Sequence, residues 1–339
     1  MKNDTESMAS SLNGVMAPVA AANHRLPQAA RRVMALLARL KVGTLTLYGP
    51  DGVAHVFGNH QAPFATLHIQ RWEVCAAVLK SGDIGFAEAY MDGDWATPSL
   101  ADLLRLFIAN RREIESAIYG HWLGRLVYQV KHWLNRNNKT NSRKNIHAHY
   151  DLGNAFYQVW LDGTMNYSSA LFGEDKNQDM AEAQKAKVRR ALRMVHAKKG
   201  DRVLEIGCGW GALAESATTE FGAHIAGVTL STEQLAFANA RMQALGVPQQ
   251  ADLRLQDYRD INDGPYDAIC SIEMIEAVGQ AYWPTYFQTI SRLLKPGGRA
   301  CVQSITIDDN LFDRYVNSTD FIQQYIFPGG CLPSPSEFR

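Results

Sequence analysis

The feature that most constrains the fold of this chain is an apolar run that breaks into three alternating glycines at residues 203–211, Val-Leu-Glu-Ile-Gly-Cys-Gly-Trp-Gly. An alanine-rich, helix-like segment follows it. This order is typical of a strand that runs into a nucleotide-binding turn. Gly207, Gly209 and Gly211 have no Cβ atom, so the chain can turn tightly and a ligand can lie against bare backbone. We therefore expect a cofactor at this turn.

Strand-like and helix-like segments continue to alternate after the glycines. Further strand-like runs cover 224–229, 252–256, 266–272 and 299–305, and Ser231 suits the N-cap of a helix over 232–245. Five such alternations predict an α/β fold, a doubly wound parallel sheet with helices on both faces. Ligands of these sheets bind at the carboxyl ends of the strands, where the strand order reverses.

Unusual residues fall at these strand ends. Asp257 and Tyr258 follow the third run, Glu273 and Glu276 follow the fourth, and the turn Leu-Leu-Lys-Pro-Gly-Gly at 293–298 precedes the fifth. The glycines have the spacing G-x-G-x-G, whereas the NAD-binding turn has G-x-G-x-x-G, so an NAD-binding fold is the weaker alternative. The pattern E-x-G-C-G-x-G, the acidic residue after the third strand and this turn together resemble the class I S-adenosylmethionine-dependent methyltransferases.

Three further stretches are more specific. They are His-Tyr-Asp-Leu-Gly-Asn at 149–154, Met-Asn-Tyr-Ser-Ser-Ala at 165–170 and Gln-Tyr-Ile-Phe-Pro-Gly-Gly at 324–330. With Glu-Ala-Val-Gly at 276–279, they resemble the cyclopropane-fatty-acyl-phospholipid synthase family and its mycolic-acid-modifying relatives. The resemblance runs from about residue 145 to the last residue, and Glu88–Trp95 extends it to the N-terminal domain of the bacterial synthases.

This resemblance implies S-adenosyl-L-methionine as the cofactor. The glycines would lie behind its methionine and ribose parts, Thr229 and Gln234 beside the ribose, and residues 256–258 around the adenine. The implied cofactor-binding residues are Tyr150, Tyr167, Ser168, Gly207, Cys208, Gly209, Gly211, Thr229, Gln234, Gln256, Asp257 and Tyr258.

The resemblance also implies a reaction. A methyl group passes to the cis double bond of an unsaturated phospholipid acyl chain, and the resulting carbocation loses a proton as a cyclopropane ring closes. Because an alkene is a poor nucleophile, such catalysis depends on alignment and on stabilisation of positive charge. In the family a bicarbonate ion takes the proton. The catalytic residues carried over to this chain are Ser169, Glu276, Gln303, Ile305 and Tyr325.

Three positions depart from the family pattern. Ser169 replaces a cysteine, Gln303 replaces an ion-binding histidine, and Ala277 replaces the histidine of E-H-x-G. Because Gln303 and Ala277 cannot carry a proton near neutral pH, proton removal would depend on the ion and on Glu276. A fatty-acyl C-methyltransferase that leaves a methyl or methylene branch is therefore an alternative, as are an inactive lipid- or cofactor-binding relative and a small-molecule methyltransferase. Glu276 itself could instead be a helix N-terminal carboxylate.

Composition limits the partners. Lysine plus arginine and aspartate plus glutamate number 34 each, so no global field attracts nucleic acid. Five cysteines without C-x-x-C spacing argue against a zinc site and a disulfide framework, and they favour a reducing cytoplasm. We expect no metal. No run approaches the roughly 18 apolar residues of a membrane span, so contact with the inner membrane face would be peripheral.

The chain divides into four predicted segments. Residues 1–25 form a mobile tail, 26–120 a small α+β domain, 121–145 a basic amphipathic linker helix, and 146–339 the methyltransferase domain. The small domain has helices over 30–41 and 100–118, with strands over 44–48, 53–57 and 65–69 between them.

Two features of these segments leave alternatives open. The linker could lie in a membrane interface or dock on the protein core. The methyltransferase domain is expected to lack the antiparallel strands that close such sheets, because the sequence ends soon after 324–330. The resemblance also leaves a homodimer open.

Overall fold

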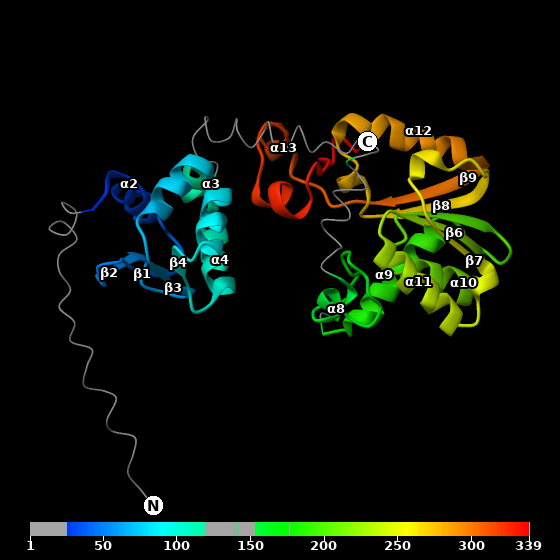
Figure 1. The fold of residues 1–339 in the computed structure, drawn as a ribbon, viewed down its shortest axis with the longest axis horizontal. Helices are drawn as coiled ribbons and strands as arrows, with labels where there is room; N and C mark the ends of the chain where they lie inside the picture. The colour runs from blue at the N-terminus through cyan, green and yellow to red at the C-terminus, as the bar shows by residue number, and fades with distance from the viewer. Residues whose placement is uncertain (1–25, 119–140, 142–152, 176, 339) are drawn as a thin grey trace, which may run out of the picture. The chain divides into compact units, whose positions relative to one another are not determined.

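The computed structural model describes residues 26–118, 141, 153–175 and 177–338 (Figure 1). The chain forms two compact units, Met1–Gln129 and Val130–Arg339. The predicted tail, Tyr150 and all of the predicted linker except residue 141 lie outside the described residues.

The first unit contains a four-stranded mixed sheet in the order β2-β1-β3-β4. The strands are β1 (Thr44–Tyr48), β2 (Ala54–Gly58), β3 (Phe64–Ile69) and β4 (Trp95–Ala96). β1 pairs antiparallel with β2 and parallel with β3. The three predicted strands are confirmed to within one residue at each end, whereas the two-residue β4 was not expected.

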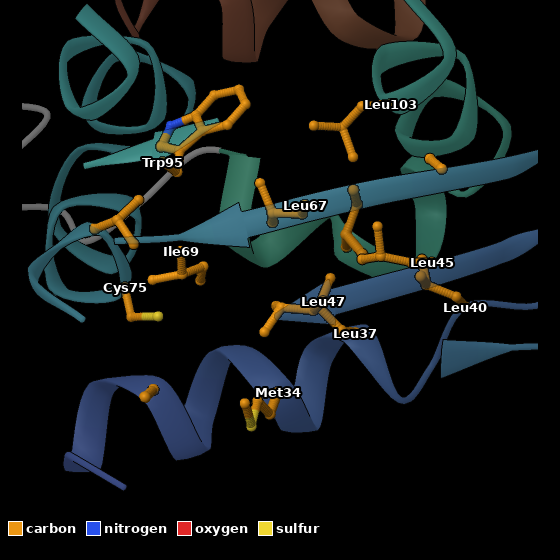
Figure 2. Close-up of a cluster of buried hydrophobic side chains, with 14 of the residues drawn as sticks. Met34, Leu37, Leu40, Leu45, Leu47, Leu67, Ile69, Cys75, Trp95 and Leu103 are labelled. Carbon is orange, nitrogen blue, oxygen red and sulfur yellow. The ribbon is translucent and has the colours of Figure 1, made fainter. Parts of the chain in front are cut away.

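Helices cover this sheet and form its core. They are α2 (Gln28–Leu37), α3 (Glu73–Met91), α4 (Leu100–Ala109) and α5 (Arg111–Ile118). Met34 and Leu37 of α2 face Leu45 and Leu47 of β1, as Figure 2 shows. All four of these side chains are buried, and burial of each contributes about 1.5–3 kcal/mol.

The predicted single helix over 100–118 is wrong, because the chain breaks at Asn110. The fully buried Asn110 side chain accepts hydrogen bonds at Oδ1 from the backbone N–H groups of Lys41 (2.8 Å) and Val42 (3.0 Å). Its Nδ2 donates to the carbonyls of Val42 (2.7 Å) and Leu106 (2.9 Å). Asparagine side chains that bond backbone groups in this way compete with a continuous helix.

The second unit is built on the predicted doubly wound sheet, which is confirmed. Five parallel strands lie in the order β7-β6-β5-β8-β9. They are β5 (Arg202–Ile206), β6 (His224–Thr229), β7 (Ala251–Leu255), β8 (Tyr266–Ile272) and β9 (Leu294–Gln303). The strand order reverses between β5 and β8, which is where such sheets bind their ligands.

Helices pack on both faces of this sheet (Figure 1). One face contacts α9 (Met180–Met194), α10 (Ala212–Thr219) and α11 (Thr232–Ala244), and the other contacts α12 (Trp283–Leu293) and α13 (Asp309–Val316). Neighbouring strand residues alternate between the faces, so Val203 joins the first core and Leu204 the second. The short α8 (Gly153–Gln158) precedes α9.

The last strand begins earlier than predicted. β9 starts at Leu294, which pairs with Tyr266, but the next pair joins Arg299 to Ala268. The Pro-Gly-Gly stretch is therefore a bulge within the strand, because one side of the ladder has extra residues. Among the described residues after β9, α13 and the π-helical turn Ile322–Ile326 are the regular elements, with no strand.

Candidate active site

A cavity of about 440 Å³ opens at the carboxyl ends of the five strands. Strand ends, the turns after them and the segment before α9 all contribute to its wall. The predicted residues that line it are Tyr167, Ser168, Gly207, Cys208, Gly209, Thr229, Gln234, Gln256, Asp257, Tyr258, Glu276 and Ile305. The structure thus brings together residues that lie more than a hundred positions apart in the sequence.

The glycine turn between β5 and α10 forms one wall. Gly209 has φ +51°, and a Cβ atom added there would meet nothing within 4 Å, so open space for a ligand lies above it. Gly211 has a different role, because a Cβ there would lie 3.0 Å from the Cβ of Ala238. Gly211 does not line the cavity but lets α10 and α11 approach closely.

Hydrogen bonds fix the turn from behind. The N–H groups of Gly207 and Cys208 both donate to the carbonyl of Val228 at 3.0 Å. The indole of Trp210 donates to Asn154 (2.7 Å), and Arg241 donates to the Trp210 carbonyl (3.0 Å). The backbone that faces the cavity is therefore preorganised for a ligand.

Polar side chains after β6 and β7 form the next part of the wall. The Thr229 hydroxyl donates to Gln234 Oε1 at 2.9 Å. Asp257 is buried and accepts from Arg259 at 2.8 and 2.6 Å, and the pair is an ion pair. The hydroxyl of Tyr258 is buried and has no hydrogen-bond partner among the described residues, and this burial raises the pKa of Tyr258 to about 12.

Two carboxylates stand on the turn after β8. Glu276 Oε1 accepts from the Ser304 hydroxyl (3.0 Å) and from the backbone N–H of Ile305. Its Oε2 is buried and has no hydrogen-bond partner among the described residues. Burial raises the pKa of Glu276, and repulsion by Glu273 acts in the same direction. The bond to Ile305 agrees with the predicted grouping of these two positions.

Glu273 is the site residue that the predicted set lacks. It lines the cavity and accepts hydrogen bonds at Oε1 from the Ser169 N–H (2.9 Å), the Ser169 hydroxyl (2.7 Å) and Gln303 Nε2 (2.8 Å). Ser169 and Gln303 do not line the cavity. They lie behind Glu273 and donate hydrogen bonds to its carboxylate, which does line it. Its position at the end of a predicted strand was the available signal.

Two buried ionisable side chains of the site come from α9 and β5. Lys187 and Glu205 are each 4% exposed, and both line the cavity. Lys187 donates to Asn166 Oδ1 (3.1 Å) and to the Ser168 hydroxyl. Burial lowers the pKa of Lys187 to about 8 and raises that of Glu205 well above its usual range. Lys187, on a helix, gave no sequence signal for the site.

The structure does not bring Tyr325 to the cavity with the other predicted residues. Its side chain is 42% exposed and contacts the ring of Phe321. From the same motif, Phe327 lines the cavity and stacks on Tyr167 with ring centroids 6.3 Å apart. The aromatic side chain that this motif contributes to the cavity is therefore Phe327, two residues after the expected Tyr325.

Two further observations concern the described residues alone. They contain no group of three or more His, Cys, Asp or Glu side chains placed to hold a metal ion. The same residues form no helix with the length and apolar character needed to cross a membrane.

Comparison with known proteins identifies similar chains. The family model described as mycolic acid cyclopropane synthetase matches residues 137–339. A tuberculostearic acid methyltransferase of Mycobacterium tuberculosis is 38% identical over 86% of this chain and 68% of its own length. The cyclopropane-fatty-acyl-phospholipid synthase of Escherichia coli is 36% identical over 81% of this chain and 69% of its own.

A solved structure is similar as well. A mycolic acid cyclopropane synthase complexed with SAH and CTAB is 31% identical and has a TM-score of 0.52, covering 57% of this chain and 71% of that one.

Proposed function

The chain belongs to the mycolic acid cyclopropane synthetase family of S-adenosylmethionine-dependent methyltransferases, and on this premise we propose that it methylates the cis double bond of an unsaturated phospholipid acyl chain. The observation that carries the proposal is the single cavity that joins the open glycine turn to the carboxylates after β8. A methyl donor and an alkene could meet there with negative charge nearby.

The residues of the cavity fit S-adenosylmethionine. Gly209 leaves open space, and Thr229 with Gln234 presents polar groups next to it. The buried hydroxyl of Tyr258, which has no hydrogen-bond partner in the described part of the chain, offers a hydrogen bond to a ligand. When bound, S-adenosylmethionine supplies a methyl group activated by its sulfonium charge.

Apolar side chains that line the same cavity suit a hydrocarbon. They are contributed by the turn after β8 and by the C-terminal segment, and they include Met274, Val278, Ile322, Phe327 and Leu332. The stacked rings of Phe327 and Tyr167 offer π faces that stabilise positive charge. Such a wall holds an acyl chain while excluding water from the cation.

We propose C-methylation without ring closure as the reaction. The 38% identical relative is named as a methyltransferase, which supports this choice. Gln303 and Ala277 also supply no ionisable imidazole beside the cation. Loss of one proton then gives a branched alkene, since a saturated branch would need a hydride donor. Cyclopropanation is the second candidate, favoured by the 36% identical relative.

Product analysis tests the proposal. The protein is incubated with isotope-labelled S-adenosylmethionine and vesicles of a cis-unsaturated phospholipid, with saturated vesicles as the control. Both candidate products gain one methylene unit, so the acyl chains are then treated with ozone, which cleaves an alkene and spares a cyclopropane. Cleavage of the isotope-labelled acyl chains supports C-methylation, and resistance of these labelled chains to ozone supports cyclopropanation. Absence of label from the acyl chains contradicts both.

We further propose that the protein reaches its substrate at the cytoplasmic membrane face. The sequence supports this, because residues 125–144 contain basic and no acidic side chains. Binding to anionic vesicles should exceed binding to neutral vesicles and weaken as salt rises. Equal binding to both contradicts this part of the proposal.

A further inference from the structure

Glu273 occupies a position that needs explanation. It has φ +49°, in the left-handed region that residues other than glycine, asparagine and aspartate rarely adopt. Its N–H donates to the Gln303 carbonyl at 2.9 Å, which extends the pairing of β8 with β9 by one residue. Strain of this kind persists where the surrounding structure over-determines it, and it clusters at active sites.

The side chain of Glu273 is held by one oxygen and open at the other. Three donors converge on Oε1, from Ser169 and Gln303. Among the described residues no donor contacts Oε2, although the residue lines the cavity. The carboxylate is thus oriented through Oε1, while Oε2 keeps its lone pairs for a proton. Glu276 differs, because its Oε2, which also lacks a donor within the described ranges, is buried.

A bicarbonate ion does not fit these residues. The resemblance assigns such an ion to Ser169, Gln303, Glu276 and the backbone of Ile305. Here Ser169 and Gln303 donate to Glu273, and the Ile305 N–H donates to Glu276. A free anion would find these donors engaged and would lie beside two carboxylates, which repel it.

We infer that Glu273 is itself the proton acceptor of the reaction and replaces a free anion at this position. The inference rests on the proposed function. The π electrons of the alkene form the new bond to the methyl carbon as its bond to sulfur breaks, which leaves a cation on the neighbouring carbon. Glu273 Oε2 then takes a proton, and the electrons of that C–H bond form the C=C bond of the product. A carboxylate is basic enough because a proton next to a carbocation is strongly acidic.

Variants of Glu273 test this inference. Glu273→Gln keeps the shape and an Oε1 acceptor, and it should lower turnover by about 10²–10⁴-fold while S-adenosylhomocysteine affinity changes less than about threefold. Glu273→Asp should recover part of the rate. Glu273→Ala should be rescued by added formate, a small carboxylate. Glu220→Gln, on a surface glutamate paired with Arg189, is the matched control and should keep full activity.

Two readouts separate a proton acceptor from a structural residue. In Glu273→Gln, water should capture more of the cation, so hydroxylated acyl chains should increase relative to branched alkene. The wild-type rate should not change in bicarbonate-free buffer. Full turnover in Glu273→Gln, or a wild-type rate that falls without bicarbonate and returns with it, overturns the inference. Wild-type protein that labels no acyl chain contradicts the proposed function instead.

Discussion

Replacement of Lys187 by methionine should remove a pH dependence from the stability of the second unit. The Lys187 side chain is 4% exposed, and its ammonium donates to Asn166 and Ser168. Two hydrogen bonds do not restore the hydration that a buried ammonium loses. Burial therefore lowers the pKa of Lys187 from 10.5 to about 8, although nearby Glu273 and Glu205 oppose the shift.

The sign and the size of the change in unfolding free energy with pH follow from these two pKa values. Below pH 8 Lys187 is charged in both states, and the cost of burying the charge is fully present. Between pH 8 and 10.5 the unfolded chain keeps the proton that the folded protein releases, so stability rises with pH. A shift from 10.5 to about 8 corresponds to about 3 kcal/mol in total. From pH 7 to pH 10 the gain is between about 2 and 3 kcal/mol.

Equilibrium unfolding in urea measures this difference. Cys270 is fully buried in β8. A brief pulse of thiol label is applied at each urea concentration, and the amount of label on Cys270 reports unfolding of the second unit alone. The wild type should gain stability relative to Lys187→Met as pH rises. Lys185→Met on the same helix removes only a surface pair with Glu182 and keeps Lys187, so its stability should rise with pH as that of the wild type does. A constant difference between wild type and Lys187→Met from pH 7 to 10 would refute the reasoning.

The remaining predictions concern the cofactor, the reaction and the first unit. Gly209→Val should weaken S-adenosylhomocysteine binding more than about 100-fold by calorimetry, because the side chain enters the open space, whereas Gly246→Val, also at positive φ with open space, should not. Retained affinity would contradict this placement of the cofactor. Glu276→Gln should spare that affinity but lower turnover in the labelling assay, and full activity would remove Glu276 from the mechanism. Asn110→Ala should destabilise the first unit by about 2–4 kcal/mol, since buried backbone groups lose their partners, and an unchanged urea midpoint for Cys75 labelling would refute this.

The second unit was predictable because its central strands β5, β6 and β8 are mostly buried. The runs 224–229 and 266–272 match β6 and β8 to the residue. Such strands are continuous apolar runs bounded by turn residues, so local sequence defines them. The glycine turn was predictable for the same reason, because it lies directly after β5.

Features set by tertiary contacts were not predictable. Asn110 has the spacing of a helical residue, yet its amide bonds backbone groups 68 and 69 positions away and the helix ends there. Gly211 belongs to the glycine pattern, but its lack of Cβ accommodates Ala238 of α11. In both cases the partner lies on another element, so local patterns carry no sign of it.

The roles of site residues were also not predictable from local sequence, but their contacts in the structure explain them. Taken singly, Ser169 and Gln303 look like losses of catalytic groups. In the structure they are donors to Glu273, contributed by three segments separated by up to 134 positions. A free anion needs a cationic or strongly polar pocket to stay bound, whereas a carboxylate attached to the chain is held by its own backbone and needs only donors that orient it. A neutral amide and a hydroxyl supply those donors and add no positive charge to a cavity that Lys187 already lines. The three residues are therefore best interpreted as one unit, in which the departures at 169 and 303 accompany the glutamate at 273.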